Sequence, residues 1–253
     1  MRIPSIFATE EWLTIPFKDR KKSVFDNVID TITIISSLLS RLDASKYKGD
    51  SPEAEIQRIL VRKEATKIKE QLDQWWDMEL RDASRTHGWN GDYFRGVPGF
   101  DFDYDCLKPE SAFTEAGITV QYPDKNSESE HSTAPLPERA VQFYKESRAT
   151  AFYSTARILT LSILNEVGSS PALFAQQMQA HCESILSVST FITGMDIGYA
   201  YVRLVLPLTL VTRLSPLPSQ RDRAKIVLQK WSQKGGVAGL CEVVLSGMQE
   251  PTS

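Results

Sequence analysis

The spacing of apolar residues along the chain predicts helices. In the first strongly patterned segment, residues 23–45, apolar side chains recur three or four positions apart, at Phe25, Val28, Ile29, Ile32, Ile35, Leu39 and Leu42. This is the period of a single helix face. We therefore expect one amphipathic helix in this segment.

A second amphipathic helix is predicted to begin at Pro52, a residue common in the first turn of a helix, and to run to residue 80. Its apolar residues are expected to share one face, opposite a face rich in Lys, Arg and Glu. They are Ile56, Ile59, Leu60, Ile68, Leu72, Trp75, Trp76 and Leu80.

Five further helices are predicted in the C-terminal half, at residues 137–168, 169–193, 196–214, 219–233 and 236–248. They are apolar on more than one face, which indicates burial among other helices. Gly168 is expected to end the first of them. Residues 84–137, in contrast, are rich in Gly, Pro, Asp, Asn and Ser without a sustained period, which predicts a long irregular loop. The pattern as a whole predicts an all-α fold, a single compact domain over residues 1–253 with about seven helices.

The most apolar stretch of the chain, residues 191–218, predicts a distorted core helix and not a membrane span. A span needs about 20 predominantly apolar residues, whereas charged residues and Pro207 interrupt this stretch. Pro207 removes an internal hydrogen bond, and Gly194 and Gly198 leave a shallow side that a ligand can approach. We therefore predict that residues 194–208 form one wall of an internal, mostly apolar cavity.

Polar side chains beside these glycines are the candidate contacts of that cavity. Tyr199, Tyr201 and Arg203 are hydrogen-bond donors that could polarise a carbonyl in a catalysed reaction. Asp196 would be a further binding residue. The alternative is a buried Asp196–Arg203 pair with two phenols that hydrogen-bond within the protein.

Aromatic residues are candidates for the other sides of the cavity. Trp75 and Trp76 could contact a ligand, although tryptophans at helical core positions more often serve packing. Trp89 and Tyr104 would contribute from the aromatic part of the long loop. His87, in the same loop, is a candidate general acid or base, and the alternative is an exposed loop histidine.

Composition narrows the class of protein. The 29 basic and 32 acidic side chains give a net charge of −3, without the basic field that nucleic-acid binders use. The three cysteines, Cys106, Cys182 and Cys241, are scattered and lack zinc-ligand spacing, so reduced thiols and no metal or other cofactor are expected. We expect no signal peptide before the first helices. The prediction is an intracellular protein, in the cytosol or the nucleus.

A diffuse motif pattern runs along the chain from Phe7 to Met248. It consists of "FATEEWLTIPFKDRKKSVFDNVIDTI", a helix ending "LDQWW", "FYSTARILTLSIL", "GMDIGYAYVRLVLPLTLV" and the closing "RAKIVLQKWSQKGGVAGLCEVV". This pattern resembles the C-terminal regulatory region of fungal zinc-cluster transcription factors. The resemblance implies an all-helical domain whose interior binds small molecules or contacts transcriptional partners.

The chain departs from that family in one respect. The family's DNA-binding domain needs six closely spaced cysteines that hold two zinc ions, and this chain has three scattered cysteines. It therefore cannot read DNA by the family's route. It is either a natural short protein or a piece of a longer factor.

Two function classes follow from these observations. In the first, the chain is a regulatory-type domain with an internal pocket for an apolar small molecule and does not itself bind DNA. A protein partner or a second copy of the chain is compatible with this reading. In the second, the chain is a cofactor-free enzyme that acts on an apolar fungal secondary metabolite, as a cyclase, a cycloaddition catalyst or an isomerase. The same pocket would then hold the substrate in a reactive conformation.

Overall fold

The computed structural model describes residues 9–15, 18–19, 22, 24–76, 138–168, 171–195 and 198–248. The elements in chain order are α1 (Glu10–Thr14), α2 (Val24–Tyr47), α3 (Pro52–Trp75), α5 (Glu138–Glu166), α6 (Pro171–Met195), α7 (Gly198–Leu214), α8 (Pro218–Trp231), the short 3₁₀ helix η6 (Gly235–Val237) and α9 (Ala238–Ser246). No strand occurs in the described ranges, which confirms the predicted all-α fold. The seven predicted helices correspond to α2, α3 and α5 to α9, and the short α1 was not predicted. The predicted loop at 84–137 and the continuation of α3 to residue 80 lie outside the described residues.

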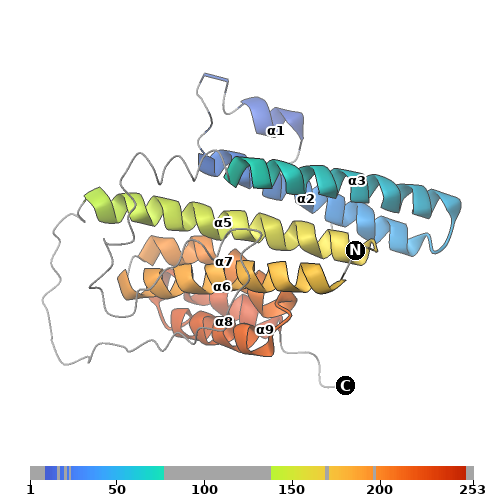
Figure 1. The fold of residues 1–253 in the computed structure, drawn as a ribbon. Coiled ribbons are helices and arrows are strands. Elements are labelled where there is room, and N and C mark those ends of the chain that lie inside the picture. Colours follow the sequence, from blue (N-terminus) through green and yellow to red (C-terminus); the bar gives the residue numbers. More distant parts are fainter. Residues whose placement is uncertain are drawn as a thin grey trace, which may run out of the picture.

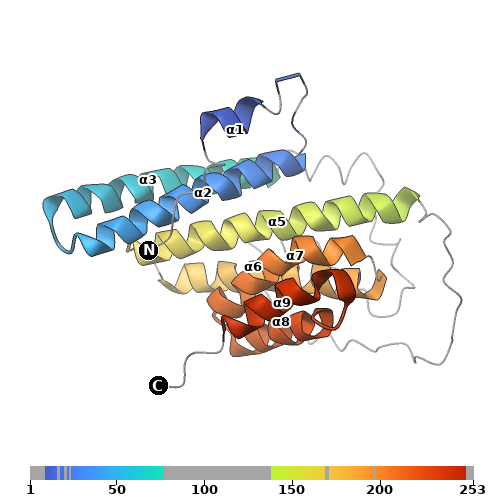
Figure 2. The ribbon, with the colours of Figure 1, turned by 180° about the vertical axis from the view of Figure 1, so that it is seen from behind.

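Helix α5 forms the centre of the domain. It packs against α2 and α3 and also against α6 and α7. Figures 1 and 2 show α2 and α3 as a pair of antiparallel helices on one side of α5, with α8 and α9 on the opposite side of the molecule. Every residue of α5 from Ala149 to Ile158 is buried. Polar side chains in this segment are therefore removed from water, and they must find partners within the protein or in a ligand.

The buried face of α3 agrees with the predicted one at Ile68 and Leu72 and differs from it in the first half of the helix. Ile56, Ile59 and Leu60 are exposed, at 59%, 57% and 43% of their surface, so their assignment to the buried face was wrong. The buried residues are Ala54, Val61, Ala65, Ile68 and Leu72. Small side chains let α3 approach α2 and α5 closely, and the large isoleucines remain on the outer side of this helix pair.

The helix boundaries follow from local chemistry. Ser51 caps α3, because its side-chain oxygen accepts a hydrogen bond from the backbone N–H of Ala54 (3.2 Å), and Pro52 occupies the first turn. Gly168 has a φ of 94°, in the left-handed region where glycine is favoured, directly after the end of α5. The prediction that this glycine ends the helix is confirmed.

Helix α7 is a core helix with Pro207 in its interior. Its buried residues include Ala200, Tyr201, Leu204, Val205, Leu208 and Val211. No helix among the described residues combines the length and the apolar character needed to cross a membrane.

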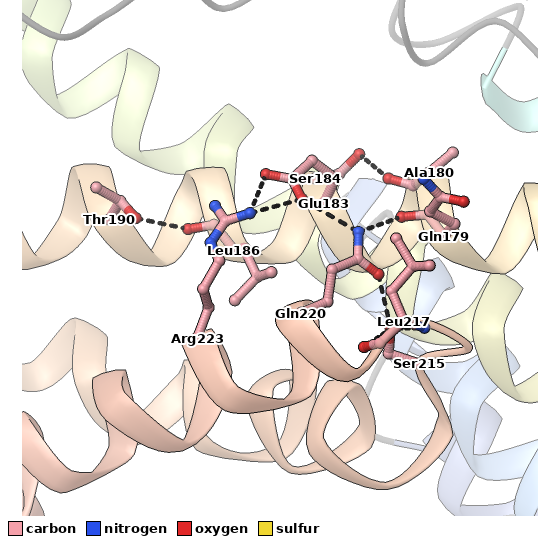
Figure 3. Close-up of polar contacts among 10 residues, drawn as sticks. All are labelled: Gln179, Ala180, Glu183, Ser184, Leu186, Thr190, Ser215, Leu217, Gln220 and Arg223. Carbon is pink, nitrogen blue, oxygen red and sulfur yellow. Dashed lines mark hydrogen bonds and ion pairs between the residues drawn. The ribbon is translucent and has the colours of Figure 1, made fainter. Parts of the chain in front are cut away.

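Gln220 connects α8 through hydrogen bonds to α6 and to the turn that precedes α8 (Figure 3). It accepts a hydrogen bond from Ser215 Oγ (2.6 Å) and donates to the Gln179 carbonyl (3.0 Å) and to the Glu183 carboxylate (3.1 Å). Arg223 donates to the same carboxylate at 2.9 Å. Because each buried polar group in this network has a partner, the contact stabilises the packing of α8 on α6.

Candidate functional site

Aromatic rings meet where α3 ends against the buried segment of α5. Trp75 is the last residue of α3 and Trp76 follows it. Both indole rings stack on Tyr153 of α5, with ring centroids 5.8 Å and 4.3 Å away. His181 of α6 meets the same tyrosine ring edge-on at 5.8 Å. Tyr153 thus connects three helices through its ring.

A buried cation lies one helical turn further along α5. Arg157 is 1% exposed, and its Nη1 pairs with the Asp73 carboxylate of α3. The same nitrogen donates to the Lys69 carbonyl at 3.3 Å. Lys69 Nζ contacts the other oxygen of Asp73 at 3.0 Å. Two cations therefore share one carboxylate next to the aromatic rings.

Buried polar side-chain atoms without a hydrogen-bond partner occur on the three helices that meet here. Within the described ranges such side-chain atoms are Trp75 Nε1, Ser154 Oγ, Arg157 Nε, Gln177 Oε1 and His181 Nδ1. We call these five residues, together with Trp76 and Tyr153, the buried polar cluster. Each unsatisfied buried group costs about 1–3 kcal/mol, and folded proteins contain few of them.

Helix geometry relates these atoms within each helix. Ser154 and Arg157 are three residues apart on α5, and Gln177 and His181 are four apart on α6, so each pair shares a helix face. The aromatic stacking and the ion pair then bring the end of α3 to the same place. The cluster thus draws its residues from three helices.

His181 is a neutral side chain in this environment. Burial lowers its pKa, and the positive charges of Arg157 and Lys69 lower it further, to about 3. A neutral imidazole this weakly basic is suited to hydrogen bonding and is a poor general base at neutral pH. The cluster offers N–H and O–H donors from Trp75, Ser154 and Arg157, an acceptor from Gln177, and an imidazole nitrogen that serves as either.

The predicted binding residues Trp75 and Trp76 both belong to the buried polar cluster. Their described contacts run to α5, whereas those of Tyr201 run to α8 and to the segment that follows it. Tyr201 accepts a hydrogen bond from Lys234 (3.0 Å), and its ring lies 4.7 Å from that of Trp231. The described contacts therefore do not bring the tryptophans and Tyr201 to one site.

Arg203 is exposed on α7, which corrects the alternative of a buried Asp196–Arg203 pair. On a helix, residues two positions apart point in different directions, so burial of Tyr201 turns Arg203 outward. The structure also places Gly194 near the end of α6 and Gly198 and Tyr199 at the start of α7. The cavity wall at residues 194–208 stays a prediction.

Other predicted positions lie outside the described residues, namely His87, Trp89, Tyr104, Cys106 and Asp196. Cys182 and Cys241 are buried free thiols. Burial raises the pKa of Cys182 to about 12, so this thiol is unsuited to nucleophilic chemistry. Among the described residues, no three His, Cys, Asp or Glu side chains form a group that could hold a metal ion.

The sequence interpretation missed most of the polar atoms of the cluster. One signal was available, because Arg157 is the only charged residue between Ala149 and Asn165. A single charge within a helix that is apolar on several faces indicates a buried, functional or paired group. Ser154, Gln177 and His181 carried no comparable signal, since such residues are also common on exposed helix faces.

The chain matches no protein-family model, no curated protein and no solved structure in the three comparisons made. The resemblance to the regulatory region of fungal zinc-cluster transcription factors therefore stays a prediction.

Proposed function

We propose that this chain is a helical regulatory-type domain that binds a small molecule at the buried polar cluster and does not itself bind DNA. The observation that carries the proposal is the set of five unpartnered buried polar atoms on α3, α5 and α6. Trp75 and His181 of this set both contact the Tyr153 ring, and Arg157 pairs with Asp73 two residues before Trp75. Among the other described residues of the core, comparable groups are paired, as in the Gln220 network (Figure 3). A ligand with complementary groups would satisfy the atoms of the cluster.

The energetic argument favours a ligand over a purely structural role. At about 1–3 kcal/mol for each unsatisfied atom, the cluster is less stable than an apolar core of the same volume would be. Functional sites commonly retain such unfavourable arrangements, because a ligand relieves them. Because the atoms come from three helices, a ligand that contacts them all stabilises one arrangement of α3 relative to α5 and α6. Such coupling is what a regulatory domain requires.

The cofactor-free enzyme remains the second reading, on the same scaffold. The described residues favour binding over proton-transfer chemistry, because the histidine of the cluster is neutral and weakly basic. Catalysis by orientation alone would use the same contacts as binding.

Thermal unfolding of the full chain tests the proposal. Wild type, Ser154→Ala and Gln177→Leu would be heated with and without a panel of planar aromatic compounds of differing charge. A ligand at about 100 times its Kd adds about 2.7 kcal/mol of stability. For a chain of this size that raises Tm by about 5–10 °C.

The two variants distinguish a binding site from a packing defect. Ser154 Oγ and Gln177 Oε1 have no partner, so we expect both variants to be as stable as wild type or more stable without ligand. We also expect them to lose much of the ligand-induced rise in Tm. Ser162→Ala, on the same helix but outside the cluster, is the matched control. The proposal fails if no compound stabilises wild type, or if active compounds stabilise wild type and both variants equally.

A further inference from the structure

We infer that the ligand of the buried polar cluster is an aromatic carboxylate that also carries a hydroxyl group, such as a hydroxybenzoate or a hydroxynaphthoate. This inference rests on the proposed function and specifies the chemical class of the ligand. It departs from the sequence-based expectation of an apolar ligand.

The charge of the cluster favours an anion. Among the residues that the structure describes, Arg157 and Lys69 share the single carboxylate of Asp73, which leaves one positive charge without an acidic partner in this network. On α2, which packs against α3 and α5, Asp30 pairs with Lys22. The lowered pKa of His181 has the same origin, because its causes after burial are the charges of Arg157 and Lys69. A monoanion would balance the charge, whereas a phosphate dianion would exceed it.

The positions of the donors favour a carboxylate in particular. The N–H groups of Arg157 and Trp75 and the hydroxyl of Ser154 are buried without acceptors. The ion pair and the ring stacking place Arg157 and Trp75 at the same end of α3. Two oxygens of one carboxylate can accept from several such donors, and hydrogen bonds to a charged group are the stronger kind.

The acceptor on α6 accounts for the hydroxyl group. Gln177 Oε1 is buried without a donor, one helical turn before His181. A purely apolar aromatic acid would leave this oxygen unsatisfied, whereas a ligand hydroxyl would donate to it. The surrounding rings of Trp75, Trp76 and Tyr153 suit a flat aromatic body.

Calorimetric titration of the full chain tests the assignment. The probes are 4-hydroxybenzoate and 6-hydroxy-2-naphthoate, each compared with its neutral amide and with the acid that lacks the hydroxyl. At least one hydroxy acid should bind about tenfold tighter than its amide, as expected for charged hydrogen bonds. Removal of the hydroxyl should also weaken binding.

Two variants assign the contacts. Trp75→Phe keeps a stacking ring but removes the indole N–H, so it should weaken the acids and leave the amides nearly unchanged. Gln177→Leu should weaken the hydroxy acids and leave the acids without a hydroxyl unchanged. Circular dichroism of each variant shows whether it is folded. Ser154→Ala is a second, smaller substitution that removes another hydrogen-bond donor, the Ser154 hydroxyl.

The outcomes separate this inference from the proposed function. If an amide binds as tightly as its acid, or if only neutral compounds of the thermal panel bind, the ligand class is wrong and the binding function stands. If neither these probes nor any panel compound binds, both are overturned. Binding of the acids that is equal in wild type, Trp75→Phe and Gln177→Leu would place the ligand at another site and refute the inference.

Discussion

The ion pair between Arg157 and Asp73 should respond differently to the loss of each partner. Arg157 is 1% exposed, whereas Asp73 is 27% exposed and keeps a second cation, Lys69, at 3.0 Å. Asp73→Ala leaves a buried guanidinium without its counter-charge. Arg157→Met leaves a partly hydrated carboxylate that is still paired, and it fills the buried volume with an apolar chain. We therefore expect Asp73→Ala to be the more destabilising change.

The magnitudes follow from the burial of each group. Removal of one partner from a buried pair costs about 3–5 kcal/mol. The Lys69 carbonyl still accepts from Arg157 at 3.3 Å, so we expect a value near the lower end, about 3 kcal/mol, for Asp73→Ala. Replacement of a buried charge by an apolar side chain is often close to neutral, so Arg157→Met should cost about 1 kcal/mol. The double variant should show a coupling energy of about 2 kcal/mol.

Urea unfolding at pH 7, followed by circular dichroism, measures all four proteins. The exposed pair Arg41–Glu64 on α2 and α3 is the matched control, with side chains 35% and 47% exposed. Its variants, Arg41→Met and Glu64→Ala, should each change the free energy of unfolding by less than about 0.5 kcal/mol. The reasoning is refuted if Asp73→Ala costs no more than Arg157→Met, or if the coupling is as small as that of the control pair.

Three further predictions concern other parts of the molecule. The pKa of His181 is lowered from 6.5 to about 3 in the folded protein. As the pH falls below 6.5, the imidazole therefore takes up a proton in the unfolded chain but not in the folded one. The contribution of His181 to the free energy of unfolding is complete above pH 6.5, and wild type should lose about 1.4 kcal/mol of it per pH unit between about pH 6 and 4. His181→Gln should lack that contribution, and identical pH dependence of urea unfolding in the two proteins would contradict the burial of a neutral imidazole. Gln220→Leu removes the partner of three polar groups (Figure 3) and should lower the free energy of unfolding by about 2 kcal/mol. The control Gln229→Leu, at an exposed position of the same helix, should lower it by almost nothing. Equal urea midpoints for the two variants would show that the network is dispensable. Given its net charge of −3, the chain should show no preference for one DNA duplex over a scrambled one at moderate salt. Nanomolar, sequence-selective binding in a fluorescence anisotropy titration would disprove this.

The sequence by itself determined the helices and several of their ends. Apolar spacing of three and four residues is a local property, so it located α2, α3 and the helices of the C-terminal half. Gly168 was recognisable as a helix end because its left-handed backbone conformation depends on its own lack of a side chain. Apolar residues on several faces likewise predicted burial, and α5 is buried on all sides from Ala149 to Ile158.

The tertiary structure decided which face of a helix is buried. On α3 the apolar spacing predicted a single buried face, which the structure confirms at Ile68 and Leu72 but not at Ile56 and Ile59. Close approach to α2 and α5 favoured the face with Ala54, Val61 and Ala65, because small side chains let the helix axes come near each other. That choice depends on the neighbouring helices, and no property of α3 alone specifies it.

The tertiary structure also decided where the candidate site lies. The sequence pointed to Trp75 and Trp76 but joined them to residues 194–208, whereas the described contacts join them to Tyr153, whose ring also meets His181. Asp73 and Arg157 are 84 residues apart in the chain, and no local pattern relates them. Whether a buried polar atom has a partner depends on such distant neighbours, because a hydrogen bond requires two atoms to lie about 3 Å apart. The buried polar cluster could therefore be found only once the helices were packed.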